Sequence, residues 1–569
     1  MSTRHTLLAV IFALLLVHST VATPIIDLGY AQYQGMVNVT TNVTTFLGIR
    51  YAAAPQGELR FRAPQPPGNQ IGVQQATAQP NQCFQAGLGT SATNPFRTRA
   101  VEVPTSEDCL FLKSGDFPSF STCIDPCISV YYPSDEQGAP IGPLPVIVWI
   151  HGGGCVRVVR GSGTALKVLV RYLQGSASQF RGTDILAQSN RGVVVVIIQY
   201  RLGVFGFLAG EEVKKNGALN AGLLDQDYAL RWVNKHISKF GGDPSKVVIW
   251  GESAGAGSVL QHIVANEGQT KPQLFRGAIT NSAYFGSQYN YNDRIPELIY
   301  REVVEQTNCS AASDSLACLR SVDVNALETA NLNINADAFF GTCTLIPVVD
   351  GQFITQNPAQ SLAQGKVNGE ALLSVTNAFE GTTFVNQSTS LNATQYALDL
   401  FPNLGSAQAE EVGALYVDLG TSLFQTEAIM GEALLICPTY YLLQAFAGRA
   451  FKGEFAIPPA IHGLDAEYYF PSIMVDFPDL FNPNSTFNNT AFIDAFAQSF
   501  TSFAISLDPN IKVDPHTITP KWNPWNVGQT EMLFNKTEIG EPIVHPVKTS
   551  DALLRRCRFW HSVGNLTGQ

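Results

Sequence analysis

The feature that most limits how this chain can fold is the pentapeptide Gly251-Glu252-Ser253-Ala254-Gly255. An apolar, strand-like stretch ends just before it, and a run of small residues compatible with a helix follows it. A G-x-S-x-G sequence between a strand and a helix is typical of the sharp turn that presents a nucleophilic serine at the top of a sheet. Taken alone, the pattern also fits a glycine-rich turn whose serine has no role.

A second glycine-rich motif lies upstream of this turn. The sequence H-G-G-G at residues 151–154 directly follows a predicted buried strand at residues 144–150. Consecutive glycines let backbone N–H groups point at one spot without side chains in the way, as an oxyanion hole requires. We therefore predict that the N–H groups of Gly153, Gly154 and Ala254 form an oxyanion hole.

The serine would need a general base and an acid, and each has a candidate further along the chain. His462 follows an apolar run and precedes a glycine, which is consistent with a loop at a strand end. Glu380 follows the strand-like residues 371–376 and also precedes a glycine, which suits a carboxylate that orients an imidazole. The pattern alone leaves His462 open as a structural histidine and Glu380 as a surface glutamate beside a turn.

Together these motifs resemble the type-B carboxylesterase and lipase family, which includes the cholinesterases. The resemblance implies Ser253 as nucleophile, His462 as base and Glu380 as acid. It also implies an α/β-hydrolase fold, with a large, mostly parallel central sheet and helices on both faces. Further stretches that resemble signatures of this family are residues 46–64, 106–112 and 220–226.

The motifs are spread from about residue 46 to residue 468, which predicts one catalytic domain over residues 23–569. Strand-like residues 193–200 and 275–280 alternate with a helical pattern at residues 228–240, as in a parallel sheet covered by helices. The apolar fraction of 45% is enough for a large core.

The N-terminus indicates secretion. Residues 1–22 combine a polar start, a short apolar run and a small-residue cleavage site, which together are typical of a signal peptide. The apolar run is too short to span a bilayer stably, and no later segment looks transmembrane. We expect a secreted, extracellular protein without integral membrane association.

Nine N-x-S/T sequons agree with secretion. Asn308 is the least suitable of them if the adjacent Cys309 is bridged. The expected glycosylation sites are Asn38, Asn42, Asn386, Asn392, Asn484, Asn488, Asn535 and Asn565.

Ten cysteines in an oxidising compartment indicate disulfides. The family resemblance implies the pairs Cys83–Cys109, Cys309–Cys318 and Cys437–Cys557. The cysteines without an evident partner are Cys123, Cys127, Cys155 and Cys343.

Two segments interrupt the family pattern. Residues 113–129 separate the E-D-C-L motif from its V-Y-Y-P-like continuation, and residues 156–174 separate H-G-G-G from a G-S-A-S-like stretch. The second segment has four basic residues and no acidic one, in a chain of net charge −11. We hypothesise that both are translated introns; the alternative is two real lineage-specific loops.

The resemblance implies ester hydrolysis through an acyl-enzyme. The segment between Cys83 and Cys109 has no Trp, so it offers no cation–π site for a choline group. Its apolar content is modest, which favours short- to medium-chain esters over an interfacial lipase acting on triacylglycerols or sterol esters. A catalytically idle adhesion or binding protein of the same fold, and an amidase using the same groups, remain as alternatives.

The expected partner is a small-molecule or lipid ester substrate. The net charge of −11 and the lack of basic runs argue against a nucleic-acid partner. No cofactor and no metal is expected, because the chain has neither a dinucleotide fingerprint nor a His- or Cys-rich metal spacing.

Overall fold

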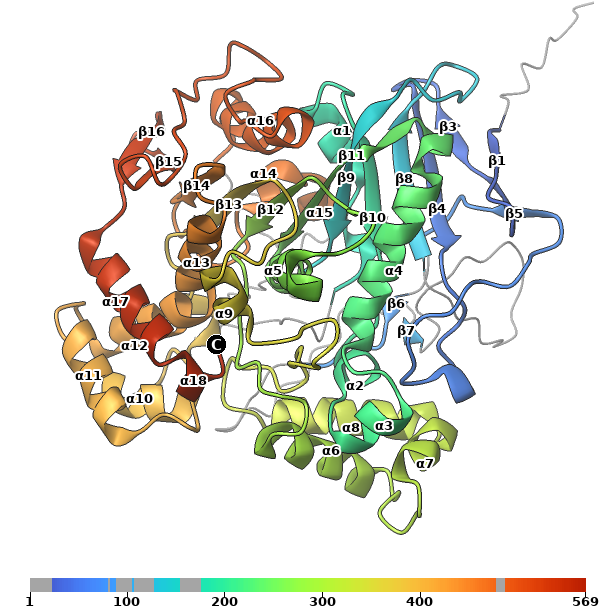
Figure 1. The fold of residues 1–569 in the computed structure, drawn as a ribbon. Helices are drawn as coiled ribbons and strands as arrows, with labels where there is room; N and C mark the ends of the chain where they lie inside the picture. The colour runs from blue at the N-terminus through green and yellow to red at the C-terminus, as the bar shows by residue number, and fades with distance from the viewer. Residues whose placement is uncertain (1–22, 80–81, 88–104, 107–126, 154–174, 477–486) are drawn as a thin grey trace, which may run out of the picture.

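The structure, a computed structural model, describes residues 23–79, 82–87, 105–106, 127–153, 175–476 and 487–569 (Figure 1). Several predicted features lie outside the described residues. They are the signal segment 1–22, residues 113–126 and 156–174 of the two suspected inserts, Cys109, Cys123, Gly154, Cys155 and Asn484.

A sheet of eleven strands forms the centre of the described chain. Its strands from β10 to β15 pair in parallel, and its two margins are antiparallel, so the predicted large and mostly parallel sheet is confirmed. In spatial order they are β16 (Pro542–Lys548), β15 (Thr530–Lys536), β14 (Ala450–Phe455), β13 (Ala371–Asn377), β12 (Gly277–Asn281), β11 (Gly242–Glu252), β9 (Leu144–Ile150), β10 (Val194–Ile198), β8 (Cys127–Pro133), β4 (Val43–Arg50) and β3 (Met36–Asn38).

The central strands are continuous apolar runs because both faces of the sheet are covered. Side chains alternate between the faces along a strand, and β9 shows this directly. Val146 and Val148 pack into one hydrophobic core, whereas Ile147 and Trp149 pack into the other.

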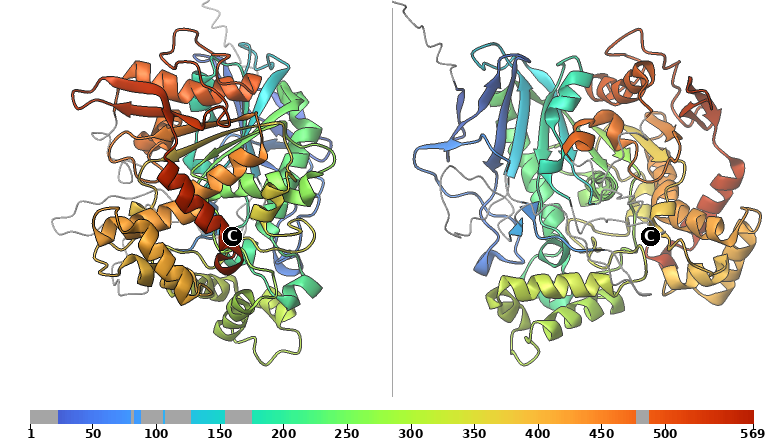
Figure 2. Two further views of the ribbon diagram at one scale, coloured as in Figure 1. Left: turned by 60° about the vertical axis from the view of Figure 1, so that its left-hand side comes forward. Right: turned by 180° about the vertical axis from the view of Figure 1, so that it is seen from behind.

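Helices cover both faces of the sheet, as predicted (Figures 1 and 2). The first core contains side chains from α4 (Ala221–His236), α5 (Ala254–Val264) and α13 (Cys437–Ala445). The second contains side chains from α1 (Gly182–Gln188), α14 (Ala466–Tyr469) and α16 (Thr490–Ser506).

Helix α4 begins seven residues before the predicted start at residue 228. Polar residues in its first turns hide the apolar pattern, yet they are buried. Asp225 is 1% exposed, and its carboxylate forms an ion pair with Arg201 at 2.7 Å. A buried ion pair therefore lies at a position where the sequence pattern indicated a solvent-exposed side chain.

A further layer of helices lies below and to the lower left of the sheet in Figure 1, and is called the helical cover below. Its members are α6 (Arg294–Gln306), α7 (Ser315–Ser321), α8 (Val324–Ala336), α10 (Ala393–Leu400), α11 (Ser406–Tyr416) and α12 (Ser422–Gly431). The other helices are α2 (Gly203–Phe207), α3 (Glu211–Asn216), α9 (Pro358–Ala363), α15 (Ser472–Asp476), α17 (Asp551–Ser562) and α18 (Gly564–Thr567). The minor strands are β1 (Ile25–Asp27), β2 (Gln32–Gln34), β5 (Val73–Gln75), β6 (Gln82–Cys83) and β7 (Thr105–Ser106).

Two of the three predicted disulfides are present among the described residues. Cys309–Cys318 closes the loop between α6 and α7, and Cys437–Cys557 joins α13 to α17. Cys83 is also disulfide-bonded, but its predicted partner Cys109 is not among the described residues.

The end of the first suspected insert lies within a strand of the sheet. Cys127, Ile128 and Ser129 belong to β8, are buried, and pair with β10 and β4. A protein that lacks residues 113–126 would therefore keep all of β8 as the structure has it.

The predicted glycosylation sites differ in exposure. Those with exposed asparagines are Asn38, Asn392, Asn488 and Asn565, and those with partly buried asparagines are Asn42, Asn386 and Asn535.

One stretch, Ser422–Ala445, is long and apolar enough to cross a membrane, but 78% of its most apolar window is buried within the fold, as in a core helix.

Candidate active site

The predicted serine turn has the geometry that its sequence indicates. β11 ends at Glu252 and α5 begins at Ala254, and Ser253 between them has φ 58° and ψ −120°. A positive φ is uncommon for a residue other than glycine, and it is the strained conformation that a nucleophile elbow imposes. A Cβ atom at Gly255 would lie 2.0 Å from the Ile150 carbonyl oxygen, so this position requires glycine.

The three predicted catalytic side chains form a continuous line of hydrogen bonds. The Nε2 atom of His462 lies 2.9 Å from the Ser253 hydroxyl oxygen, and its Nδ1 atom lies 2.6 Å from Oε2 of Glu380. The exposed fractions are 1% for Ser253 and His462 and 0% for Glu380. With Nδ1 donating to the carboxylate, Nε2 is left to accept the serine proton.

These side chains meet because each follows a strand of the parallel part of the sheet. Ser253 follows β11, Glu380 follows β13 and His462 follows β14, and carboxyl ends of neighbouring parallel strands share one edge. A short parallel bridge between Phe379 and Ile461 aligns the loop of the acid with the loop of the base.

The Glu380 carboxylate is held in its ionised form. The Ser282 hydroxyl and the Asn377 backbone N–H donate to its Oε1 at 2.5 and 2.7 Å. Burial alone would raise the pKa of Glu380, but the adjacent His462 ring and these donors together hold that pKa below its ordinary value. An ionised partner stabilises a positive charge on the imidazole.

A second carboxylate also contacts the base. Oε1 of Glu252 lies 3.2 Å from Nε2 of His462, on the side of the ring that faces the serine. The side chain of Glu252 is only 9% exposed, so water screens this contact little. Glu252 is therefore a second acidic side chain in direct contact with the base.

The predicted oxyanion loop packs directly against the serine turn. A Cβ atom at Gly152 would lie 2.5 Å from the Glu252 carbonyl oxygen and 3.1 Å from the Ser253 Cβ, so only glycine allows this approach. Gly153 and Ala254 are both described, whereas Gly154 is not.

His151, the first residue of this loop, is held in place by Tyr200. Its ring stacks on Tyr200 with a centroid distance of 4.5 Å, and the Tyr200 hydroxyl donates to the His151 carbonyl oxygen at 2.7 Å. Burial lowers the pKa of His151 to about 4, so the ring is neutral at neutral pH and adds no charge beside the serine.

The sequence pattern did not single out Asp465, which lies behind the triad. Its carboxylate accepts hydrogen bonds from Asn281 at 2.6 Å, Asn377 at 3.0 Å and Tyr469 at 3.1 Å. It is fully buried, and burial raises its pKa. Asp465 therefore links the ends of β12 and β13 to the loop that carries His462. The signal in the sequence that could have revealed it was an acidic residue within an apolar stretch, three positions after His462.

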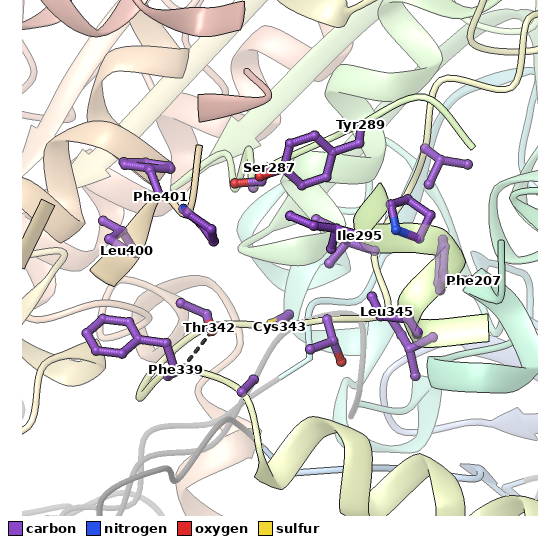
Figure 3. Close-up of a pocket in the computed structure, with 18 of the residues that line it drawn as sticks. Phe207, Ser287, Tyr289, Ile295, Phe339, Thr342, Cys343, Leu345, Leu400 and Phe401 are labelled. Carbon is purple, nitrogen blue, oxygen red and sulfur yellow. Dashed lines mark hydrogen bonds between the residues drawn. The ribbon is translucent and has the colours of Figure 1, made fainter. Parts of the chain in front are cut away.

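The described residues enclose a cavity of about 210 Å³, and Figure 3 shows part of its lining. Its wall includes Tyr284, whose backbone N–H donates to the Ser253 carbonyl oxygen at 3.3 Å. It also includes Leu434, whose carbonyl oxygen accepts from the Phe285 N–H at 2.8 Å. The lining is mostly apolar and comes largely from the helical cover and the loops around it, including Ile299, Phe339 and Leu400. Ser253, Glu380 and His462 are not among the lining residues.

This fold and this geometry can now be compared with known proteins. The sequence model of the carboxylesterase family matches residues 22–560. The chain belongs to the carboxylesterase family. It is accordingly an enzyme of the esterase and lipase type, with the α/β-hydrolase fold that the motifs implied.

Individual relatives support this assignment. The chain is 33% identical over 371 residues to Secreted lipase 1 of Botryotinia fuckeliana (strain B05.10), a match that spans 63% of this chain and 60% of that relative. It is 30% identical over 496 residues to Lipase 4 of Diutina rugosa, spanning 82% of this chain and 84% of the relative. The solved structure of Aspergillus niger EstA superposes with a TM-score of 0.79 at 29% identity, covering 96% of this chain and 99% of EstA.

Proposed function

We propose that this carboxylesterase is a secreted serine hydrolase that cleaves short- to medium-chain carboxylic esters through an acyl-enzyme. The observation that carries the proposal is the hydrogen-bonded line from the Ser253 hydroxyl through His462 to Glu380. A hydroxyl, an imidazole and a buried carboxylate in this order are the groups that general-base activation of a serine requires.

The reaction proceeds in two half-reactions. Nε2 of His462 takes the Ser253 proton as Oγ bonds to the ester carbonyl carbon, and the ring then returns that proton to the departing alkoxide as the C–O bond breaks. Water, activated by the same nitrogen, attacks the acyl-enzyme, releases the carboxylic acid and restores the serine. Glu380 holds Nδ1 and stabilises the transient imidazolium.

The backbone N–H groups of Gly153, Gly154 and Ala254 donate to the oxyanion that develops in each step. Losing one such donor typically costs about 3–4 kcal/mol of transition-state stabilisation. The close packing of Gly152 on the serine turn supports this role, because it brings the glycine loop to the N-terminus of α5.

The cavity takes the acyl chain, a role supported by the hydrogen bond between the backbone of its lining residue Tyr284 and that of Ser253. Its volume of about 210 Å³ is below the roughly 300–1,000 Å³ usual for drug-sized ligands, which favours short to medium acyl groups. Relatives named as lipases make hydrolysis of longer, water-insoluble esters the competing function.

The same proposal covers how the mature protein is organised. Residues 1–22 are removed as a signal peptide, and residues 23–569 form one catalytic domain outside the cell. Two relatives whose names include the word secreted support the location. Glycans attach most readily at the exposed sequons of Asn38, Asn392, Asn488 and Asn565.

The test is a stopped-flow measurement of p-nitrophenol release from p-nitrophenyl butyrate, with Ser253→Ala as the control. We expect a burst close to one equivalent per active site, followed by turnover, and neither in the control. The same run with tributyrin emulsions separates an esterase from an interfacial lipase, because a lipase gains activity above the solubility limit.

A second protein, which lacks residues 113–126 and 156–174, tests the effect of the suspected inserts on activity. A burst only in the shortened protein would mean that the added segments disturb the oxyanion loop. No release by either protein would contradict the proposed function.

A further inference from the structure

One peptide group of the oxyanion loop must keep a fixed direction if the loop is to bind an oxyanion. The carbonyl oxygen of Gly152 and the N–H of Gly153 belong to the same planar, trans peptide group, so they point in opposite directions. Whatever holds the Gly152 carbonyl oxygen therefore also fixes the direction of the Gly153 N–H, one of the proposed oxyanion donors.

Two neighbours hold the Gly152 carbonyl oxygen. Nδ1 of the neutral His151 ring lies 2.9 Å from it, and this nitrogen donates, because a carbonyl oxygen can only accept. Gly175 also packs against this oxygen, so closely that an added Cβ atom at Gly175 would lie 2.0 Å from it. The position of Gly175 thus limits how far the 152–153 peptide group can rotate.

The side-chain amide of Gln85 holds Gly175 through both of its polar atoms. Nε2 of Gln85 donates to the Gly175 carbonyl oxygen at 3.0 Å, and Oε1 accepts from the Gly175 N–H at 3.3 Å. A primary amide can donate and accept at the same time, so one side chain satisfies both main-chain groups of Gly175. These two bonds join residues 82–87 to the oxyanion loop.

Gln85 is itself anchored by its surroundings. Cys83, two residues earlier, is disulfide-bonded, and the ring of Phe84 stacks on Phe205 with a centroid distance of 5.2 Å. The backbone N–H of Gln85 donates to the carboxylate of Glu328 on α8, a helix of the helical cover. A side chain on a backbone held in this way can fix the position of a loop that it contacts.

We propose that Gln85 is a positioning residue for the oxyanion hole. Through Gly175 and the Gly152 carbonyl oxygen, it keeps the Gly153 N–H directed at the developing oxyanion. This inference rests on the proposed function, since it takes Gly153 as an oxyanion donor. Gln85 acts only through these glycines and takes no part in the bond-making steps.

The first test measures kcat and KM for p-nitrophenyl butyrate in Gln85→Met, which keeps the length of the side chain and removes both hydrogen bonds to Gly175. A misplacement of about 1 Å costs about 100-fold in rate, so we expect kcat to fall by roughly 10- to 100-fold. The oxyanion forms in both half-reactions, so acylation and deacylation should slow together and KM should stay nearly the same. Active sites are counted by labelling with a fluorophosphonate, so that unfolded protein does not contribute.

Gln75→Met is the matched control. Gln75 is a partly buried residue of β5, and its side-chain amide donates to Gln34 at 3.2 Å. Its replacement removes an amide hydrogen bond outside the oxyanion loop and should leave kcat unchanged. A kcat of Gln85→Met equal to that of this control, or a loss confined to KM, would overturn the inference.

The second test uses a stable mimic of the tetrahedral intermediate, 1,1,1-trifluoropentan-2-one. Oγ of Ser253 bonds to the ketone carbon as the C=O double bond opens, the serine proton moves to Nε2 of His462, and the ketone oxygen becomes the oxyanion. We expect Gln85→Met to raise the inhibition constant of this ketone by about the factor by which kcat/KM falls. An unchanged inhibition constant beside a lowered kcat would mean that Gln85 does not act through the oxyanion hole.

If Gln85→Met does not fold, Gln85→Glu is measured in the same way. Its carboxylate still accepts from the Gly175 N–H but, at neutral pH, cannot donate to the Gly175 carbonyl oxygen, so the same direction of change is expected. Absence of hydrolysis by the wild-type protein would count against the proposed function alone. An active wild type whose Gln85 variants keep both kcat and the inhibition constant would overturn the inference.

Discussion

The candidate reaction centre and the cavity are built by different parts of the molecule. Ser253, Glu380 and His462 follow three strands at one edge of the sheet, are at most 1% exposed, and are linked by short hydrogen bonds. The cavity wall comes mainly from the helical cover and its loops and is mostly apolar. The sheet thus sets the geometry of the candidate reaction centre, and the helical cover shapes the cavity that we propose to hold the acyl chain.

This difference predicts two kinds of variant. A change in the reaction centre should slow the hydrolysis of every ester by a similar factor, because it alters an interaction made in every transition state. A change in the cavity wall should alter the ratio between esters and leave the smallest ester almost unaffected.

The largest expected effect comes from Glu380→Gln. Loss of the carboxylate leaves the imidazole in the wrong tautomer and its cation without a partner, so kcat should fall by about 10⁴-fold. Steady-state kinetics with the p-nitrophenyl esters of acetate and hexanoate should show the same factor for both. Glu410→Gln, at an exposed position on α11, is the control. A loss of kcat that depends strongly on acyl-chain length would contradict the division between reaction centre and cavity.

The next effect is a change in chain-length preference caused by Ala338→Phe. Ala338 lines the cavity just after α8, so the larger side chain would fill space that the acyl group needs. One methylene in an apolar pocket is worth about 10–200-fold in kcat/KM, and hexanoate should lose that much relative to acetate. Ala312→Phe, an exposed site outside the cavity, should leave the ratio as it is. Equal losses for the two esters would show that the cavity does not hold the acyl chain.

A smaller effect, on stability, is expected for Asp465→Asn. The carboxylate accepts from three donors, and an amide would turn an N–H group toward at least one of them. The free energy of unfolding should fall by about 1–3 kcal/mol, measured by urea denaturation. The exposed Asp337→Asn serves for comparison, and an unchanged midpoint for Asp465→Asn would mean that the network does not stabilise the His462 loop.

The smallest effect concerns pH. The pKa of Glu380 is lower in the folded protein than in the unfolded chain, so its ionisation stabilises the fold fully above the unfolded value, about 4.3. That contribution is lost as pH falls through the folded pKa. The difference in unfolding free energy between the wild type and Glu380→Gln should therefore shrink between about pH 5 and pH 3. A difference that stays constant or grows over this range would contradict the lowered pKa.

Local patterns predicted much of what lies at the strand ends. The predicted helix after Ser253 coincides with α5, and the predicted strand before Glu380 coincides with β13 to within one residue. The patterns failed where buried polar groups replace apolar ones, as at the start of α4, where Asp225 is satisfied by a residue distant in the sequence. Asp465 escaped notice for the same reason, because its partners come from three separate segments.

The sequence by itself indicated the class of fold and the residues that meet at the reaction centre, the serine from its local motif and the acid and base from the resemblance to the carboxylesterase family. A glycine-flanked serine between strand and helix, and acidic and basic residues just after later strands, constrain the backbone locally, and local constraints can be read along the chain. Only the tertiary structure decided the distances among Ser253, His462 and Glu380, the neighbours that lower the pKa of the acid, and the shape of the cavity. These depend on contacts between segments that lie far apart in the sequence, and no local pattern contains them.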